Sequence, residues 1–358
     1  MRIRLVTVLL LICSSCFALS PLHLADQAAF LADSPTLKSV VPFPVGAAIN
    51  IKLLRKHQGY RNKIISQYNS ITAENAMKFG KLHPSEKEFR WADADELVNF
   101  ANVNGMRIHG HTLIWSAKNP KWVDAYQGDK NSWKKLLKTH VQTVVKHFKG
   151  RVKSWDVVNE AFEDNGKLKK CVWLENIGPE YLELAFQYAH EADPKALLFF
   201  NDYGQEYGGR KMEAILKMVK DFKARNIPIH GLGLQMHVVV RMSDTGLAKG
   251  IKLAASTGLL VHVSELEISV RYKKPKVFQM DEELANLQAH KYKTVFEAFR
   301  SIPKKQQFGI TTWNVGDADA FRNGPYKNKN HDHPMLFDIY YRAKPAYYAI
   351  INAMSRRR

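Results

Sequence analysis

The feature that most constrains the fold is an alternation of short apolar runs with segments of helical periodicity. Eight runs have the length and composition of buried β-strands, and the segments between them carry apolar residues at helical spacing, such as Leu182, Ala185 and Phe186. Strands that alternate with helices in this way form parallel sheets. The expected strands are 45–49, 70–72, 106–109, 152–158, 196–200, 231–234, 259–263 and 308–312.

Eight strand–helix units favour a closed barrel over an open doubly wound sheet. The open sheet would carry a glycine-rich phosphate-binding turn after its first strand, and segment 45–50 lacks that spacing. We therefore predict an α/β fold, a (β/α)8 TIM barrel, with a single domain at residues 45–353 and no cofactor. The length of 358 residues and the hydrophobic content of 46% suit one large core.

The N-terminus has the layout of a secretory leader. Arg2 and Arg4 precede an apolar run that is too short to span a bilayer, and small residues follow as far as Ala18. We predict a signal peptide at 1–18, an N-terminal lead at 19–44 and a basic tail at 354–358. The chain is then exported, either secreted or periplasmic, and its mature part has no integral membrane segment. An imperfect lipobox leaves open a second outcome, in which the leader ends before a lipid-anchored Cys16.

The formal net charge is +19, and removal of the two leader arginines lowers it to +17. Lysines and arginines recur throughout the chain without a nucleic-acid-binding motif, so we expect a solvated basic exterior and no nucleic-acid partner. An acidic polysaccharide or a membrane surface remains open as an anionic partner. Two of the three cysteines lie in the predicted leader, which leaves Cys171 alone and excludes a disulfide framework. We expect a monomer with an inert Cys171.

Polar side chains follow the expected strands at their carboxyl ends. In a barrel these ends meet at one face, where active sites lie. Amides, carboxylates, histidines and tryptophans suit sugars, whose hydroxyls need hydrogen bonds and whose C–H faces stack on aromatic rings. In strand order the residues are Asn50, Glu74 with Asn75, His111, Asn159 with Glu160, Asn201 with Asp202, Gln235 with His237, Glu265 with Glu267, and Trp313.

Glu160 and Glu265 are the pair that points to a reaction. Alone, Glu160 could equally be a residue that starts a helix, where negative charge is favourable. Glu265 follows it by 105 residues, roughly three strand–helix units, so the two carboxyls belong to the fourth and seventh strands and face each other across the barrel mouth. Glycoside hydrolysis needs such a pair, because one carboxyl protonates the leaving oxygen while the other attacks or activates water.

Five stretches occur in order along the chain: T-A-E-N-A-M-K at 72–78, G-H-T-L-I-W at 110–115, W-D-V-V-N-E-A at 155–161, S-E-L-E-I at 264–268 and K-P-A-Y-Y at 344–348. Together they resemble glycoside hydrolase family 10 endo-β-1,4-xylanases over essentially the whole mature chain. The resemblance implies a retaining endo-1,4-β-xylanase, which cleaves internal bonds of xylan or xylo-oligosaccharides by double displacement and binds no metal.

The resemblance also implies a role for each matching residue. Glu160 matches the acid/base and Glu265 the nucleophile. Asn159 matches the amide that bonds the 2-hydroxyl of the sugar at the cleavage point. His237 would hold Glu265 ionised and oriented, with Glu267 as its support. The positions implied for substrate binding are Glu74, Asn75, Lys78, His111, Trp115, Lys118, Gln235, Trp313 and Phe321, with Asn201 and Tyr203 in a loop of the cleft wall.

Several positions depart from the family pattern, among them Ser116 and Ala117 next to Lys118. Lys118 places a cation where an amide donates to a distal sugar, and Glu267 is one methylene longer than the usual aspartate. Phe321 replaces a tryptophan, which keeps an apolar lid but removes the indole N–H. Gly204 removes a side chain from the cleft wall. We interpret these as changes that tune the substrate, because none affects the two carboxylates.

Two other kinds of protein remain as alternatives. His109 and His111 resemble the His-x-His pair of metal-dependent amidohydrolase barrels, but that pair belongs on the first strand and here lies on the third. We therefore expect His109 to be a packed barrel histidine. A non-catalytic polysaccharide-binding barrel would keep the tryptophans and lose one carboxylate, whereas Glu160 and Glu265 are both present.

Overall fold

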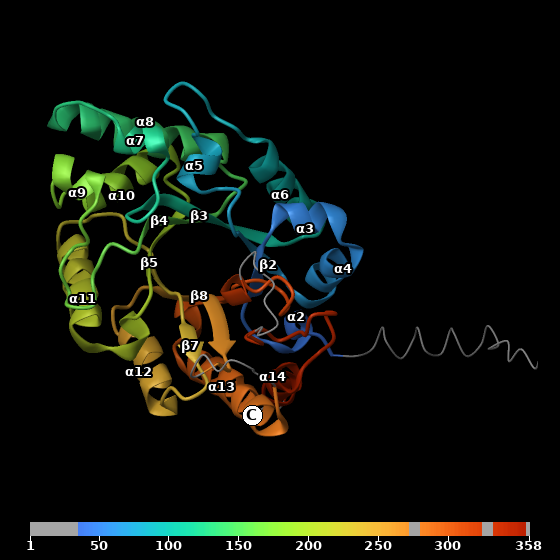
Figure 1. Ribbon diagram of the computed structural model, residues 1–358. Helices are drawn as coiled ribbons and strands as arrows, with labels where there is room; N and C mark the ends of the chain where they lie inside the picture. Colours follow the sequence, from blue (N-terminus) through green and yellow to red (C-terminus); the bar gives the residue numbers. More distant parts are fainter. Residues whose placement is uncertain (1–34, 272–279, 324–331, 356–358) are drawn as a thin grey trace, which may run out of the picture. The chain divides into compact units, whose positions relative to one another are not determined.

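A closed barrel of parallel strands lies at the centre of the fold, and helices surround it (Figure 1). The computed structural model describes residues 35–271, 280–323 and 332–355. Neighbouring strands pair in parallel from β1 to β6, and the ring closes where β6 pairs with β8 and β9 pairs with β1. This confirms the predicted (β/α)8 TIM barrel. The strands of the ring are β1 (Val45–Ile49), β2 (Ser70–Ala73), β3 (Arg107–Trp115), β4 (Ser154–Asn159), β5 (Leu197–Asp202), β6 (Gly231–Leu234), β8 (Leu260–Ser269) and β9 (Gln307–Thr312).

All eight expected strands are present, but several run further than the apolar pattern indicates. β3 and β8 continue to Trp115 and Ser269, because backbone pairing with neighbouring strands persists past the glycine and polar residues that interrupt the apolar runs. A short strand that was not predicted, β7 (His237–Val239), pairs with β8. Three residues are too few to give a strand pattern in the sequence.

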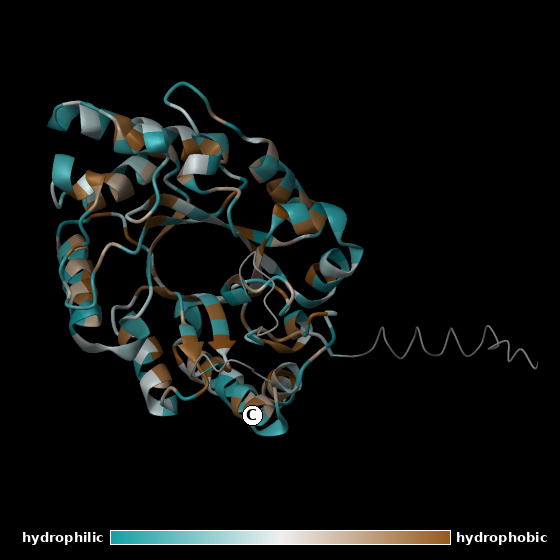
Figure 2. Cartoon of the chain, in the orientation of Figure 1, coloured by the Kyte–Doolittle hydropathy of each residue, from teal (hydrophilic) through white to brown (hydrophobic). Residues whose placement is uncertain are grey.

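The helices form because each has an apolar face and, in the longer ones, a clear starting residue. Asp129 and Asp281 cap α8 and α13 by accepting a hydrogen bond from a backbone N–H at 2.8 Å. Hydrophobic residues concentrate on the helix faces turned toward the barrel (Figure 2). The helices are α2 (Leu37–Val40), α3 (Ile51–Lys56), α4 (Gln58–Gln67), α5 (Phe79–Leu82), α6 (Ala92–Val103), α7 (Lys121–Asp124), α8 (Lys130–His147), α9 (Val172–Asn176), α10 (Tyr181–Ala192), η1 (Gln205–Tyr207), α11 (Gly209–Ala224), α12 (Asp244–Ala255), α13 (Glu282–Ser301), η2 (Lys304–Gln306), η3 (Phe321–Asn323) and α14 (Pro345–Ser355).

Rings from four strands pack together in the barrel interior. The ring centroids of Phe199 and Phe308 are 4.5 Å apart, and those of His109 and His262 are 4.9 Å apart. His109 is buried and its Nδ1 lies 2.8 Å from the Ser154 hydroxyl. The sequence-based expectation of a packed barrel histidine is confirmed.

Gly110 explains why two of the sequence motifs occur together. It lies opposite Trp155 in the β3–β4 register, and a Cβ atom at Gly110 would come within 2.2 Å of the indole ring. A larger residue there would force Trp155 out of the core. The glycine of G-H-T-L-I-W therefore makes room for the tryptophan of W-D-V-V-N-E.

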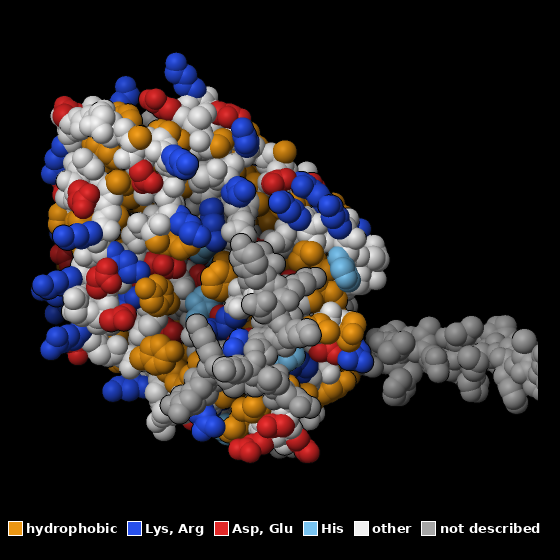
Figure 3. Space-filling model, in the orientation of Figure 1, with side chains coloured by type: hydrophobic (Ala, Val, Ile, Leu, Met, Phe, Trp, Pro, Cys, Tyr) orange, Lys and Arg blue, Asp and Glu red, His pale blue; other side chains and the backbone are white. Residues whose placement is uncertain are grey.

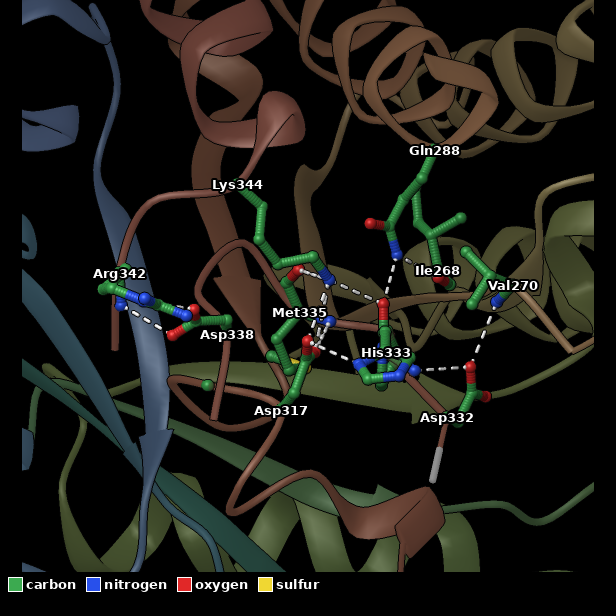
Figure 4. Close-up of polar contacts among 12 residues, drawn as sticks. Ile268, Val270, Gln288, Asp317, Asp332, His333, Met335, Asp338, Arg342 and Lys344 are labelled. Carbon is green, nitrogen blue, oxygen red and sulfur yellow. Dashed lines mark hydrogen bonds and ion pairs between the residues drawn. The ribbon is translucent and has the colours of Figure 1, made fainter. Parts of the chain in front are cut away.

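Buried polar contacts hold the segment that follows β9 (Figure 4). The Lys344 ammonium donates to the Asp317 carboxylate at 3.0 Å and to the carbonyl oxygens of His333 and Met335 at 2.7 and 2.8 Å. Asp332 accepts from the backbone N–H of Val270, just after β8, at 3.1 Å. The lysine of K-P-A-Y-Y therefore anchors described residues of the segment between β9 and α14.

The boundaries of the barrel differ from those that the sequence predicts. The end of the predicted lead belongs to the barrel domain, because α2 lies within it and Leu37, Val41 and Phe43 are buried in the core. The described residues from Thr36 onward form one compact unit, and α14 extends to Ser355, two residues into the predicted tail. The predicted signal peptide with Cys16, the lead as far as residue 34 and residues 356–358 lie outside the described residues.

Lysines and arginines are spread over the face shown in Figure 3, interleaved with acidic residues rather than gathered in one stripe. Within the described part of the chain, no helix is both long and apolar enough to cross a bilayer. Cys171 is buried, and burial raises the pKa of its thiol. A neutral buried thiol is a poor nucleophile, which fits the inert role expected for Cys171.

Candidate active site

A cavity of about 570 Å³ opens at the carboxyl ends of the barrel strands. All of the predicted site residues line it except Asn201 and Glu267. The lining residues are Glu74, Asn75, Lys78, His111, Trp115, Lys118, Asn159, Glu160, Tyr203, Gly204, Glu206, Tyr207, Gln235, His237, Glu265, Trp313 and Phe321. The polar residues at the strand ends, which the sequence analysis used, therefore meet at one cavity.

Glu160 follows the last residue of β4 and has a φ of 57°, in the left-handed region that non-glycine residues rarely adopt. Its backbone N–H donates to the Asn201 carbonyl at 2.8 Å. The carboxyl Oε1 accepts from the side-chain amides of Asn159 and Gln235, both at 3.1 Å, and Lys169 Nζ lies 3.8 Å from Oε2. Backbone strain of this kind persists where the surrounding structure fixes a side chain.

Glu265 is held from both sides in a nearly closed environment, with 4% of its surface exposed. Its Oε1 accepts from Asn201 Nδ2 at 2.8 Å, and its Oε2 lies 3.2 Å from His237 Nε2. Burial alone would raise the pKa of Glu265, but the hydrogen bond with His237 and the proximity of His111 outweigh burial and lower the pKa. Glu265 is therefore a carboxylate at neutral pH.

His237 lies between two carboxylates. Its Nδ1 is 2.8 Å from Glu267 Oε1, and its Nε2 faces Glu265. Burial alone would lower the pKa of His237, but the two carboxylates raise it to about 10. The imidazole is therefore charged at neutral pH and donates from both nitrogens. Glu267, which lies opposite His237 in the β7–β8 register, makes the contact that the sequence predicted despite its extra methylene.

Lys78 lies between two tryptophans on one side of the cavity. Its ammonium is 5.0 Å from the ring centroid of Trp115 and 5.7 Å from that of Trp313, and it donates to Asn75 Oδ1 at 3.1 Å. Burial lowers the pKa of Lys78, and the nearby Glu265 opposes this change. The tryptophan faces and polar tips give this side the composition of a sugar-binding surface.

The two histidines of the third strand both point to Asp156. His111 Nδ1 lies 2.8 Å from Asp156 Oδ2, and His109 Nε2 lies 3.0 Å from Oδ1. Burial alone would raise the pKa of Asp156, but the two histidines lower it well below its ordinary value. Within residues 35–271, 280–323 and 332–355, no three His, Cys, Asp or Glu side chains are arranged to hold a metal ion.

The rim of the cavity is more exposed than its floor. Phe321 has 63% of its surface exposed and Tyr203 has 38%, while the Lys118 ammonium lies 5.5 Å from the Trp115 ring centroid. The hydroxyl of Tyr203 accepts from Lys169 Nζ at 3.2 Å. These side chains are available to a ligand that extends beyond the two carboxyls.

The sequence-based placement of Asn201 in a loop is wrong. Asn201 lies within β5, fully buried, because the strand pairs with β6 for two residues beyond its expected end. Its side-chain N–H groups donate to Asn159 Oδ1 and Glu265 Oε1, both at 2.8 Å, and its Oδ1 accepts from Ser264. Asn201 therefore connects the surroundings of the two carboxyls and does not line the cavity wall.

Sequence reasoning missed several residues around the cavity. Glu206 lines it with 1% of its surface exposed, and burial raises the pKa of its carboxyl to about 7. Tyr207 also lines it and is 56% exposed. Arg322 lies 2.7 Å from Glu267, and Lys169 lies near Glu160. All of them are in loops or short helices, where no strand pattern singles them out.

Comparison with known proteins decides the family. The family model described as "Glycosyl hydrolase family 10" matches residues 36–353 of this chain. The chain belongs to glycosyl hydrolase family 10. The family 10 match begins at α2 and ends within α14, so it covers the complete barrel.

Several bacterial xylanases resemble this family 10 chain in sequence and structure. A β-1,4-xylanase of Dictyoglomus thermophilum is 38% identical over 325 residues, which are 88% of this chain and 90% of that protein. Endo-1,4-β-xylanase A of Thermoanaerobacterium saccharolyticum is 36% identical over 89% of this chain, and this chain spans only 28% of its length. A mutant of the xylanase TsXylA of T. saccharolyticum, solved with xylotriose, superposes with a TM-score of 0.82 at 34% identity and covers 89% of this chain and 98% of that chain.

Proposed function

We propose that this family 10 chain is a retaining endo-1,4-β-xylanase that hydrolyses internal β-1,4-xylosidic bonds of xylan. One observation carries the proposal. A buried carboxylate, Glu265, held by Asn201 and His237, shares a cavity with a second carboxyl, Glu160, which neutral amides hold. The xylotriose bound to the T. saccharolyticum relative supports a xylose-based substrate.

In the first step Glu265 attacks the anomeric carbon, and the bond from that carbon to the leaving oxygen breaks. Glu160 gives its proton to the leaving oxygen, so the shortened chain departs as a neutral alcohol. In the second step Glu160, now a carboxylate, removes a proton from water as the water oxygen attacks the same carbon and releases Glu265. Two inversions at one carbon give net retention.

The surroundings of each carboxyl suit these roles. Glu265 must be ionised before substrate arrives, and charged His237 stabilises that form. Glu160 must carry a proton in one step and lack it in the next. The amides of Asn159 and Gln235 donate to Oε1 only, which accepts in either state and leaves Oε2 to carry the proton.

Product analysis on xylan tests the proposal. The wild-type enzyme should release a ladder of internal fragments from xylan, and Glu265→Gln should release no reducing sugar while it still binds xylan in an affinity gel. Glu191→Gln, at a surface position of α10, is the matched control and should behave as wild type. Xylan binding without turnover by the wild-type protein would instead favour a non-catalytic polysaccharide-binding barrel. Turnover that a chelator abolishes and zinc restores would favour the metal-dependent alternative.

We further propose that the chain is exported, which rests on Arg2, Arg4 and the apolar run that follows them. Expression of the full chain in a bacterial host, followed by fractionation, tests this. The mature protein should appear in the periplasm or the medium, beginning after Ala18. Recovery in the membrane fraction, lost in Cys16→Ser, would favour the lipid-anchored form, and recovery of uncleaved protein in the cytoplasm would contradict export.

A further inference from the structure

Glu267 is a buried carboxylate with few partners. Its exposed fraction is 1%, and its Oε1 alone receives both of its short contacts, from His237 Nδ1 at 2.8 Å and from Arg322 Nε at 2.7 Å. Its Oε2 is buried without a hydrogen bond from any described residue. Because an uncompensated buried charge is strongly destabilising, the position of this carboxylate depends on these two donors.

Arg322 is delivered by a short helix, η3, whose backbone is fixed. Its neighbour Asn323 donates to the carbonyl oxygens of Asp317 and Asp332 at 2.9 and 3.0 Å, and accepts from the Asp332 N–H at 2.8 Å. Asp317 is in turn held by Lys344 (Figure 4). The Arg322 side chain is 30% exposed, whereas that of Glu267 is 1% exposed, so Arg322 reaches the buried carboxylate from the solvent side.

We propose that Arg322 is a positioning residue, which holds Glu267 against His237 and thereby keeps His237 aimed at Glu265. This inference rests on the proposed function, in which Glu265 is the nucleophile. No sequence pattern indicates this contact, because Arg322 lies 55 positions after Glu267 in a segment with no strand pattern. The pair also explains how the chain accommodates Glu267 in place of the shorter aspartate, since Oε1 of the longer side chain meets both donors.

Loss of Arg322 should raise the pKa of Glu265. It removes a positive charge from the cluster and loosens the bond from His237, and both changes favour the protonated form of Glu265. The acid limb of kcat/KM, which reports protonation of the nucleophile in the free enzyme, should move to higher pH. Other charged or titratable groups around this cluster among the described residues include Glu206 and Tyr207 on η1, His111 on β3, Asp156 on β4, Tyr292 on α13 and Lys78 before α5. They are unchanged in the variants below.

The test compares Arg322→Gln with Arg322→Lys and with a control, Arg342→Gln. Arg342 also pairs with a carboxylate, Asp338, at 2.7 Å but is 72% exposed. On an aryl xylobioside, Arg322→Gln should lose roughly 10- to 100-fold in kcat/KM, the range seen when a group that orients a catalytic residue is removed. Its acid limb should rise by about half a pH unit or more, while Arg322→Lys recovers part of both effects. Arg342→Gln should match wild type.

A second comparison isolates the Arg322–Glu267 pair. In a Glu267→Asp background, where the carboxylate is withdrawn by one methylene, Arg322→Gln should cost less than about threefold, because the contact that it removes is already weakened. Equal losses in both backgrounds would mean that Arg322 acts on general stability and would overturn the proposal.

A titration that needs no activity separates this proposal from the proposed function. The side-chain carboxyl of Glu265, followed by 13C NMR and assigned with Glu265→Gln, should titrate at higher pH in Arg322→Gln than in the wild type. An unchanged titration and an unchanged acid limb would refute the role of Arg322, whatever happens to kcat. If the wild type proved inactive on every xylan, the proposed function would fail, and the carboxyl titration would still decide whether Arg322 positions the cluster.

Discussion

The two carboxyls of the cavity differ in what holds them. Glu265 is surrounded by a charged chain, His237, Glu267 and Arg322, in which each member is within hydrogen-bond or ion-pair distance of the next. Glu160 receives two neutral amides on one oxygen, with a lysine 3.8 Å from the other. A charged chain fixes one protonation state, whereas neutral donors permit two. The difference matches a nucleophile that must stay ionised and an acid/base that must change.

Removing each carboxyl in turn should have the largest effect and tests whether Glu265 and Glu160 have different roles. Glu265→Gln should lower kcat roughly 10⁴-fold or more on every substrate, because no substituent can replace the attacking oxygen. Glu160→Gln should lose roughly 10²- to 10⁴-fold on xylan. On an aryl xylobioside whose leaving group needs no protonation, it should keep a fast first step, seen as a burst of released phenol. Equal losses for both variants on the aryl substrate would contradict the separate roles.

Asn201 tests the difference between the two carboxyls, because it contacts Glu265 directly and contacts Asn159, which donates to Glu160. Asn201→Ala removes the donor to Glu265 Oε1 and the bond to Asn159, so kcat/KM should fall roughly 10- to 100-fold on xylan and on the aryl substrate alike. Asn104→Ala, at the end of α6, is a control with a similar loss of one amide and should leave kinetics unchanged. An effect confined to KM would instead place Asn201 among residues that bind substrate directly.

The charge on His237 predicts a pH dependence of stability. Its folded pKa of about 10 lies above the value of about 6.5 expected in the unfolded chain, so its contribution is complete below pH 6.5 and is lost as pH rises toward 10. Over that window the wild type should lose up to about 1.4 kcal/mol of unfolding free energy per pH unit more than His237→Asn. Urea denaturation at several pH values measures this. Parallel curves for the two proteins would show that His237 is neutral in the fold.

The smallest effect is expected at the rim. Lys118 is exposed and contacts only the Trp115 ring among the described residues, so Lys118→Gln should leave kcat/KM on undecorated xylan within about twofold. On glucuronate-substituted xylan it should cost about two- to fivefold at low salt, and this difference should vanish at high salt. A salt-independent loss on both substrates would show that Lys118 acts through Trp115 rather than through its charge.

Much of this architecture is predictable from sequence, for reasons that also explain the failures. The short apolar runs predict the barrel strands. The polar residues that follow these runs include Glu160, Glu265 and most of the residues that line the cavity. β7 was missed because three residues carry no periodicity, and Asn201 was placed in a loop because the apolar run ends before the strand does. Residues that reach the site from segments between strands, such as Arg322 and Glu206, become apparent only when the chain is folded.

The anomeric configuration of the first product tests the central claim most directly. Wild-type enzyme acting on xylohexaose can be followed by proton NMR within the first minutes, before mutarotation scrambles the new reducing ends. A nucleophilic Glu265 and an acid/base Glu160 predict that the β-anomer appears first and that the α-anomer grows only at the rate of mutarotation. An initial α-anomer would mean a single displacement by water, and would contradict the assignment of Glu265 as the nucleophile.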